Sequence, residues 1–130
     1  MNNIVSYLDK IEDKIVSKPA SEREIEYAQI ALGLKFSEEY IEVLRHYGCL
    51  LVKGETFFGI AQNKAYDVVT NTIEEKRFSP EIPRDMYVVS SLGIDGILIL
   101  QKEDGHIFEL DPSREPRLIK ESLMDYIIDL

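Results

Sequence analysis

The side chains that could act as nucleophiles or metal ligands in this sequence are few and scattered. Cys49 is the only cysteine, and His46 and His106 are the only histidines. A thiol nucleophile needs an adjacent base, and a metal site needs several converging ligands. The two histidines fall on different expected elements, and no evident partner stands near Cys49 in the sequence. We therefore expect neither thiol catalysis nor a metal centre, and we interpret Cys49 as a small residue in a buried strand.

Two other segments resemble catalytic motifs only in part. Ser90 and Ser91 are not set in the G-x-S-x-G turn that exposes a nucleophilic serine. Residues 92–96 (LGIDG) have the glycines of a phosphate-binding loop but lack its lysine, and Asp95 would repel phosphate. We interpret this segment as a turn between strands. The sequence thus predicts a protein that is not an enzyme and that holds no cofactor.

The charge of the chain restricts its partners. The 130 residues carry a net charge of −9, and residues 66–130 account for −7 of it, with fourteen acidic and seven basic side chains. Such a surface repels nucleic acid and attracts a basic protein. The alternative is that the acidity only keeps the protein soluble. We expect a protein partner and no direct contact with nucleic acid.

Apolar runs and cysteine use indicate the compartment. No stretch approaches the ~18 apolar residues of a membrane span, and the first residues carry charges where a signal peptide is apolar. A lone cysteine agrees with a reducing compartment. We expect a cytoplasmic protein that forms a single domain over residues 1–130 and does not enter the membrane. The oligomeric state is left open.

Helical patterns dominate the first third of the chain. Ile4, Leu8, Ile11 and Ile15 recur at helical spacing, and the helix they predict ends before Pro19. A second helix begins at Ser21, whose partner Glu24 completes a capping box, and it ends at Gly33. A third helix begins at Ser37 and ends at Gly48. Acidic residues open this third helix and basic residues close it, as the helix dipole favours.

Strands dominate the remainder. Residues 49–52 and 56–60 predict a hairpin around Lys53 and Gly54, and residues 64–77 are interpreted as a helix. Three strands (86–90, 97–101 and 106–110), a short edge strand (117–119) and a closing helix (121–130) follow. Short turns between strands imply antiparallel pairing. The predicted fold class is α+β: one sheet of five to six strands, mainly antiparallel or mixed, packed by N-terminal, central and C-terminal helices.

Three blocks of the sequence resemble the SUKH superfamily, also known as the Smi–Knr group. In the first, residues 24–50, a helix ends in Leu-Gly and a second helix with an aromatic residue ends in Gly. The second is the FFGI segment at residues 57–60, and the third is the glycine-containing strand pair at residues 93–108. The order of these blocks is more specific than each one alone. The link at residues 35–37 departs from the pattern, because it lacks the usual proline.

This resemblance implies a sheet with helices packed around it and a role in binding. Bacterial members of the group resemble immunity proteins, each of which binds and blocks a cognate toxin, in many cases a nuclease. A basic toxin domain would suit the acidic charge of this chain. Other members act as adaptor or regulatory modules without a toxin partner, and that alternative stays open. No catalytic residue is transferred, because the family motif is structural.

The residues that contact the partner are the least constrained part of the prediction. The acidic C-terminal half directs attention to turn carboxylates, and these are Asp95, Glu103, Asp104 and Asp111. A second candidate patch consists of Glu55, Phe58, Tyr66 and Asp67. The neighbours Phe57 and Phe58 should point to opposite faces of a strand, so that one of them faces either a helix layer or the exposed side, and the second alternative would give an interaction surface. For each carboxylate the alternative is a solvated turn residue.

Overall fold

The computed structural model describes residues 3–93, 96–112 and 114–130. It contains five α-helices, one 3₁₀ turn and seven strands within those ranges. The elements follow in the order α1 (Ile4–Asp9), β1 (Lys14–Val16), α2 (Glu22–Leu32), α3 (Glu38–His46), β2 (Leu50–Val52), β3 (Glu55–Phe57), η1 (Lys64–Tyr66), α4 (Val68–Phe78), β4 (Tyr87–Ser91), β5 (Leu98–Gln101), β6 (Ile107–Leu110), β7 (Arg117–Lys120) and α5 (Leu123–Ile128). The predicted α+β class is confirmed. Among the described residues, no helix is both long and apolar enough to cross a bilayer.

The second and third helices begin and end where their capping residues predict. The Glu24 N–H donates to Ser21 Oγ at 3.1 Å, and the Ser21 N–H donates to Glu24 Oε1 at 2.9 Å, which completes the capping box. Gly33 closes α2 with a φ of 66°, a left-handed conformation that favours glycine. Ser37 caps α3 by accepting from the Tyr40 N–H at 3.0 Å.

The first helix is shorter than predicted. It ends at Asp9, and residues 14–16 instead form the strand β1, with Ile15 67% exposed to solvent. Ile11 and Ile15 keep the spacing of a helical stripe, but Ile15 and Val16 are β-branched and pair with Leu51 and Leu50 of β2. Pairing with an existing hairpin therefore overrides the local periodicity.

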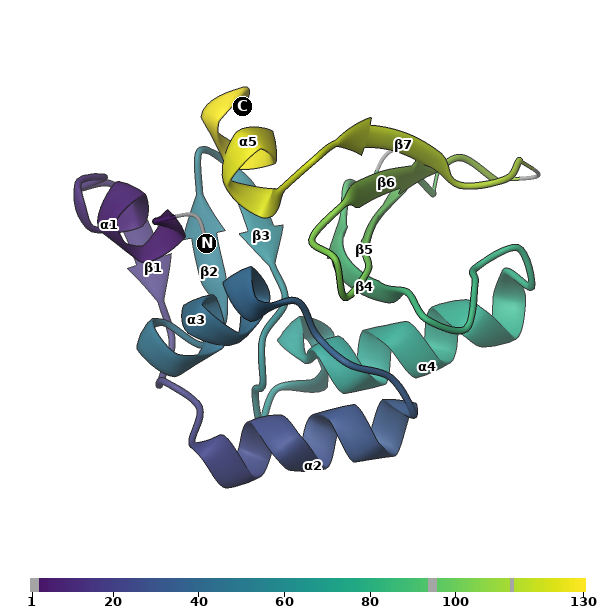
Figure 1. Ribbon diagram of the computed structural model, residues 1–130, viewed down its shortest axis with the longest axis horizontal. Helices are drawn as coiled ribbons and strands as arrows, with labels where there is room; N and C mark the ends of the chain where they lie inside the picture. The colour runs from purple at the N-terminus through teal and green to yellow at the C-terminus, as the bar shows by residue number, and fades with distance from the viewer. Residues whose placement is uncertain (1–2, 94–95, 113) are drawn as a thin grey trace.

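The strands form two sheets, so the prediction of one sheet of five to six strands is wrong. The order β1-β2-β3 makes one antiparallel sheet and β4-β5-β6-β7 the other (Figure 1). The two sheets meet where the Phe58 N–H donates to the Val89 carbonyl at 2.8 Å and Ser90 Oγ donates to the Thr56 carbonyl at 2.8 Å. Beyond Phe58 the chain leaves β4, because Gly59 bridges to Asp67 instead. These two bonds therefore do not develop into a β3–β4 ladder, and the described strands remain in two sheets.

The hairpin of β2 and β3 turns at Lys53 and Gly54, as predicted. Both residues have positive φ, 52° and 81°, which is the geometry of a two-residue turn that matches strand twist. The helix predicted over residues 64–77 is divided into η1 and α4. Asp67 separates them, because its carboxylate accepts from the Thr70 N–H at 3.0 Å and so starts a new helix.

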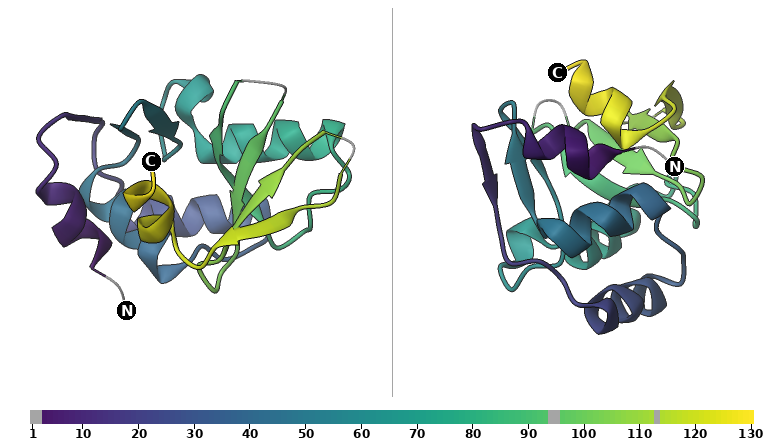
Figure 2. Two further views of the ribbon diagram at one scale, coloured as in Figure 1. Left: turned by 90° about the horizontal axis from the view of Figure 1, so that it is seen from above. Right: turned by 60° about the vertical axis from the view of Figure 1, so that its left-hand side comes forward.

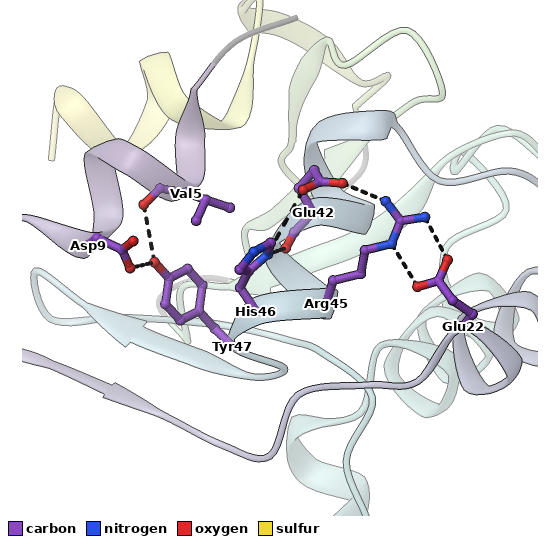
Figure 3. Close-up of polar contacts among 7 residues, drawn as sticks. All are labelled: Val5, Asp9, Glu22, Glu42, Arg45, His46 and Tyr47. Atoms are coloured by element: carbon purple, nitrogen blue, oxygen red, sulfur yellow. Dashed lines mark hydrogen bonds and ion pairs between the residues drawn. The ribbon is translucent and has the colours of Figure 1, made fainter.

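Helix α3 lies at the centre of the packing. Its buried residues Tyr40, Val43 and Leu44 are at most 2% exposed. Its C-terminal end connects to both preceding helices (Figure 3): Arg45 pairs with Glu22 of α2 at 2.6 Å, and the Tyr47 hydroxyl donates to Asp9 at the end of α1. Figures 1 and 2 show α5 at the junction of the two sheets. The N-terminal end of α3 faces the start of α5, where the candidate site is found.

Candidate functional site

An acidic pocket lies where the start of α3, the turn between β5 and β6, and the start of α5 meet. It has a volume of about 450 Å³ and is open to solvent. Its lining consists of Phe36, Ser37, Glu38, Glu39, Glu103, Asp104, Gly105, Glu121 and Ser122. Five of these nine residues are carboxylates and none is basic. We refer to this site as the acidic pocket.

The local sequence explains why carboxylates gather there. Glu38 and Glu39 occupy the first turn of α3, a position that helices favour for acidic residues. Ser122 caps α5 by accepting from the Asp125 N–H at 3.0 Å, with Glu121 just before it. On the third side, Gly105 takes a φ of 95° in the turn that carries Glu103 and Asp104. Two helix starts and one strand turn thus contribute their acidic residues to a single pocket.

Glu39 forms the floor of the pocket and holds its walls together. Only 8% of the residue is exposed. Its Oε1 accepts from Gln101 Nε2 at 2.9 Å and from the Leu123 N–H at 2.7 Å, and its Oε2 accepts from the Met124 N–H at 2.9 Å. The carboxylate therefore caps α5 from a different helix, and charge-assisted bonds of this kind are strong.

A chain of buried hydrogen bonds continues from Gln101. The Tyr87 hydroxyl donates to Gln101 Oε1 at 2.9 Å and accepts from the Ser37 N–H at 2.9 Å. Gln101 Nε2 also donates to the Gly105 carbonyl at 2.9 Å, which fixes the turn at the pocket rim. Burial raises the pKa of Tyr87, so its hydroxyl keeps the proton that this chain requires. Together with the Glu39 bonds, this chain links the floor of the pocket to the start of α3, to the β5–β6 turn and to the start of α5.

The remaining carboxylates, Glu38, Glu103, Asp104 and Glu121, are exposed around the rim. Asp104 stabilises its own turn by accepting from the His106 N–H at 3.0 Å. On the far side of the same turn, a second depression is lined by Lys35, Arg84 and Lys102. That depression also contains Asp85 and shares Glu103 and Asp104 with the acidic pocket, so its charges are mixed, whereas the lining on the side of α3 and α5 is acidic without a basic residue. A lysine or arginine side chain of a partner fits this arrangement, since both donate to carboxylates.

The acidic pocket does not have the arrangement of a metal site. Within residues 3–93, 96–112 and 114–130, no group of three or more histidines, cysteines or carboxylates is placed to hold a metal ion. The thiol of Cys49 lies elsewhere, half-buried just before β2 rather than inside a buried strand, and burial raises its pKa. A raised pKa disfavours the thiolate, which is the nucleophilic form.

The first predicted group of contact residues is divided by the structure. Glu103 and Asp104 both line the acidic pocket. Asp111 is half-buried after β6 and is not part of the lining. Asp95 lies outside the described residues.

The second predicted group does not form a patch. Phe58 is 7% exposed and Phe57 is 1% exposed, so the suggestion that one of them faces solvent is wrong. Phe58 belongs to the hydrophobic core, and the residue after it, Gly59, packs closely against Gly48. Asp67 caps α4, and Glu55 accepts from the Tyr126 hydroxyl at 2.9 Å. Of this group only Tyr66, 46% exposed, has a side chain open to a partner.

Sequence reasoning missed Glu38, Glu39 and Glu121 as site residues. A usable signal was present, because Glu38 and Glu121 each adjoin a serine that caps a helix, and Glu39 lies two residues after one. Helix starts concentrate acidic residues, but only the tertiary fold shows that two of these starts face one turn.

A model of the SUKH_5 family, described as SMI1-KNR4 cell-wall, matches residues 1–130 of the chain. The match covers the whole sequence, including the helix ends and glycines that resemble this group. The chain therefore belongs to the SUKH superfamily. No curated protein is significantly similar to it.

Proposed function

We propose that this protein is a non-catalytic, cytoplasmic binding protein of the immunity type, which neutralises a cognate toxin with a basic surface. The observation that carries this proposal is the acidic pocket: five carboxylates from three elements around one opening, with no basic residue in the lining. Membership of the SUKH superfamily supports a role in protein interaction. A nuclease toxin has a basic groove for its nucleic acid, and that groove would complement the pocket.

The proposed mode of neutralisation is direct contact with the toxin's basic residues. Glu38, Glu103, Asp104 and Glu121 would pair with lysine or arginine side chains of the toxin and so cover the groove. The acidic C-terminal half, with a net charge of −7, would speed the encounter. The buried bonds of Glu39 already fix the floor of the pocket, so the conformational entropy lost on binding is mainly that of the exposed rim side chains.

The test is co-expression with the toxin encoded beside the gene. We expect growth to be rescued and a stable complex to form. The double variant Glu103→Lys/Asp104→Lys should weaken the complex by roughly tenfold or more, with a slower association rate that becomes less dependent on salt. The matched control is Glu26→Lys/Glu74→Lys, which makes the same charge change at exposed positions on α2 and α4.

Three outcomes separate the possibilities. Unrescued killing with no complex would refute the immunity role. Binding to a cellular protein in the absence of any neighbouring toxin gene would indicate the adaptor role instead. Equal weakening by both double variants would mean that total charge, rather than the acidic pocket, determines the affinity.

A further inference from the structure

Strand β1 is the open edge of the three-stranded sheet. In the described part of the chain, β2 pairs with it on one side and no strand pairs with it on the other. Its two apolar side chains are correspondingly exposed, Ile15 by 67% and Val16 by 45%. Leu50, which faces Val16 across the ladder, is fully buried. Exposure therefore rises toward this edge, as it does where a neighbouring strand is missing. Figure 2 shows β1 at the margin of the molecule.

The backbone of β1 can accept another strand. The Ser17 N–H donates to the Cys49 carbonyl at 3.0 Å, so the backbone polar groups of Ser17 and Ile15 point toward β2. Because hydrogen-bonding groups alternate sides along an antiparallel strand, the N–H and C=O of Val16 and the C=O of Lys14 point to the open edge. The Lys14 N–H is already used, since it donates to the Glu12 carbonyl at 3.0 Å.

The charges that flank β1 would be complementary between two antiparallel copies of the strand. Glu12 and Asp13 precede the strand and Lys18 follows it. When two copies of such a segment run antiparallel, the acidic end of each meets the basic end of the other. Lys14 does not interfere, because its amine donates to the Ile11 carbonyl at 2.9 Å and lies 5.8 Å from the centre of the Tyr47 ring.

We propose that two copies of this protein associate through their β1 edges to form a symmetric dimer with a continuous six-stranded sheet. The register that suits both backbone and charge places Ile15 opposite Ile15 of the second copy. In that register the Val16 N–H of each copy donates to the Lys14 carbonyl of the other, and the acidic residues that precede one strand lie at the end where Lys18 follows the other. A closed two-fold contact of this kind uses the same edge on both subunits.

A groove lies beside β1, and dimer formation would extend it across both copies. The outer face of the sheet carries Ile15, Leu51 and Thr56, and these residues line an open, mainly apolar groove of about 810 Å³ together with Ile60 and Tyr66. Pairing at β1 would join the two grooves across the paired Ile15 side chains. The acidic pocket shares no residue with this surface, so the dimer leaves the proposed toxin site free.

The first experiment measures the mass of the full chain by sedimentation equilibrium from micromolar to millimolar concentration. We expect a reversible dimer. Lys18→Glu makes both ends of the strand acidic, and Glu12→Lys/Asp13→Lys makes both ends basic, so each variant alone should dimerise about tenfold more weakly. A mixture of the two variants should form the heterodimer in preference to either homodimer. A monomeric wild type, or a mixture with no heterodimer, would overturn the proposal.

A cross-link tests the register. In a Cys49→Ser background, Ile15→Cys should form an intermolecular disulfide under mild oxidation by oxidised glutathione, because opposed Cβ atoms in such a pair lie about 4.5–5.5 Å apart. Tyr27→Cys in the same background is the matched control, since Tyr27 is 73% exposed on α2, away from β1. Preferential cross-linking at position 15 supports the β1 edge. Equal or stronger cross-linking at position 27 would overturn it.

Discussion

The carboxylate of Glu39, in the first turn of α3, accepts a hydrogen bond at 2.7 Å from the backbone N–H of Leu123, which begins α5. The two residues are 84 positions apart in the sequence. A residue in the first turn of one helix therefore supplies a second N-terminal cap to another, in addition to the cap from Ser122. This contact ties the last helix to the centre of the fold and shapes the floor of the acidic pocket.

The variant Glu39→Gln should destabilise the protein by about 1–3 kcal/mol. Three donors now meet the two carboxylate oxygens of Glu39. Glutamine has only one oxygen that can accept, and its amide N–H₂ is a donor. At least one of the three donors, for example the Met124 N–H, would then face another donor and lose its hydrogen bond. The free energy of unfolding in urea, followed by circular dichroism, measures the loss. Amide hydrogen exchange should show that α5 loses protection first.

Glu38→Gln is the control for this prediction. Glu38 is adjacent to Glu39 in α3 but exposed, so removal of its charge should change the unfolding free energy by no more than about 0.5 kcal/mol. If both variants lost equal stability, the effect would come from the charge at the start of α3 rather than from the buried contact with α5.

The sequence predicts the helices that carry their own boundary residues and fails where boundaries depend on distant contacts. Ser21, Gly33 and Ser37 act locally, so α2 and α3 appear where they were expected. The segment after Asp9 has no such stop residue, and its conversion to β1 depends on a hairpin more than 30 residues further along the chain. The division into two sheets follows from the path of the chain after Phe58, which no local pattern records.

The candidate site was predictable only in part for the same reason. Glu103 and Asp104 were singled out because turn carboxylates are visible in the sequence. Their pairing with Glu38 and Glu121 requires three segments to meet in space. Asp67 looked like an exposed binding residue, but its spacing from Thr70 is that of a helix cap, and the structure uses it as one.

The capping box of α2 gives a second prediction. Ser21→Ala removes the oxygen that accepts from the Glu24 N–H, and it should cost about 1 kcal/mol of stability, within a range of roughly 0.5–2 kcal/mol. Ser6→Ala, at an exposed position on α1, should change stability by less than about 0.5 kcal/mol. Matching losses in the two variants, measured by urea unfolding, would show that the cap contributes nothing specific.

A third prediction concerns the pH dependence of stability. Burial raises the pKa of Glu55 above its ordinary value of 4.5, although the hydrogen bond from the Tyr126 hydroxyl partly opposes the shift. A carboxyl with a raised pKa binds its proton more tightly in the folded state. The contribution of Glu55 to stability is therefore largest below the pKa that it has in the unfolded chain. It falls as the pH rises through the higher pKa that Glu55 has in the folded protein. Relative to Glu55→Gln, the wild type should gain stability as the pH is lowered from about 7 toward 4.5.

Tyr126→Phe sharpens the Glu55 test. The Tyr126 hydroxyl donates to both Glu55 oxygens, at 3.0 and 2.9 Å, and its loss should raise the Glu55 pKa further. The pH range over which stability changes should then extend upward. Urea unfolding at several pH values gives the free energies for all three proteins. A stability difference that grows with rising pH would mean that the hydrogen bonds outweigh the cost of burial.

The fourth prediction is that Gly59 tolerates no side chain. A Cβ at this position would lie 2.5 Å from the Gly48 carbonyl carbon and 2.6 Å from the Cys49 nitrogen, both of which are backbone atoms that cannot turn aside. Gly59→Ala should therefore cost more than ~3 kcal/mol and leave little folded protein.

Gly33→Ala is the matched control, because its Cβ would meet nothing within 4 Å and only its φ of 66° is strained. That strain should cost about 1–2 kcal/mol. Urea midpoints and soluble yield distinguish the two effects, and a Gly59→Ala protein as stable as Gly33→Ala would mean that the two backbone segments can separate.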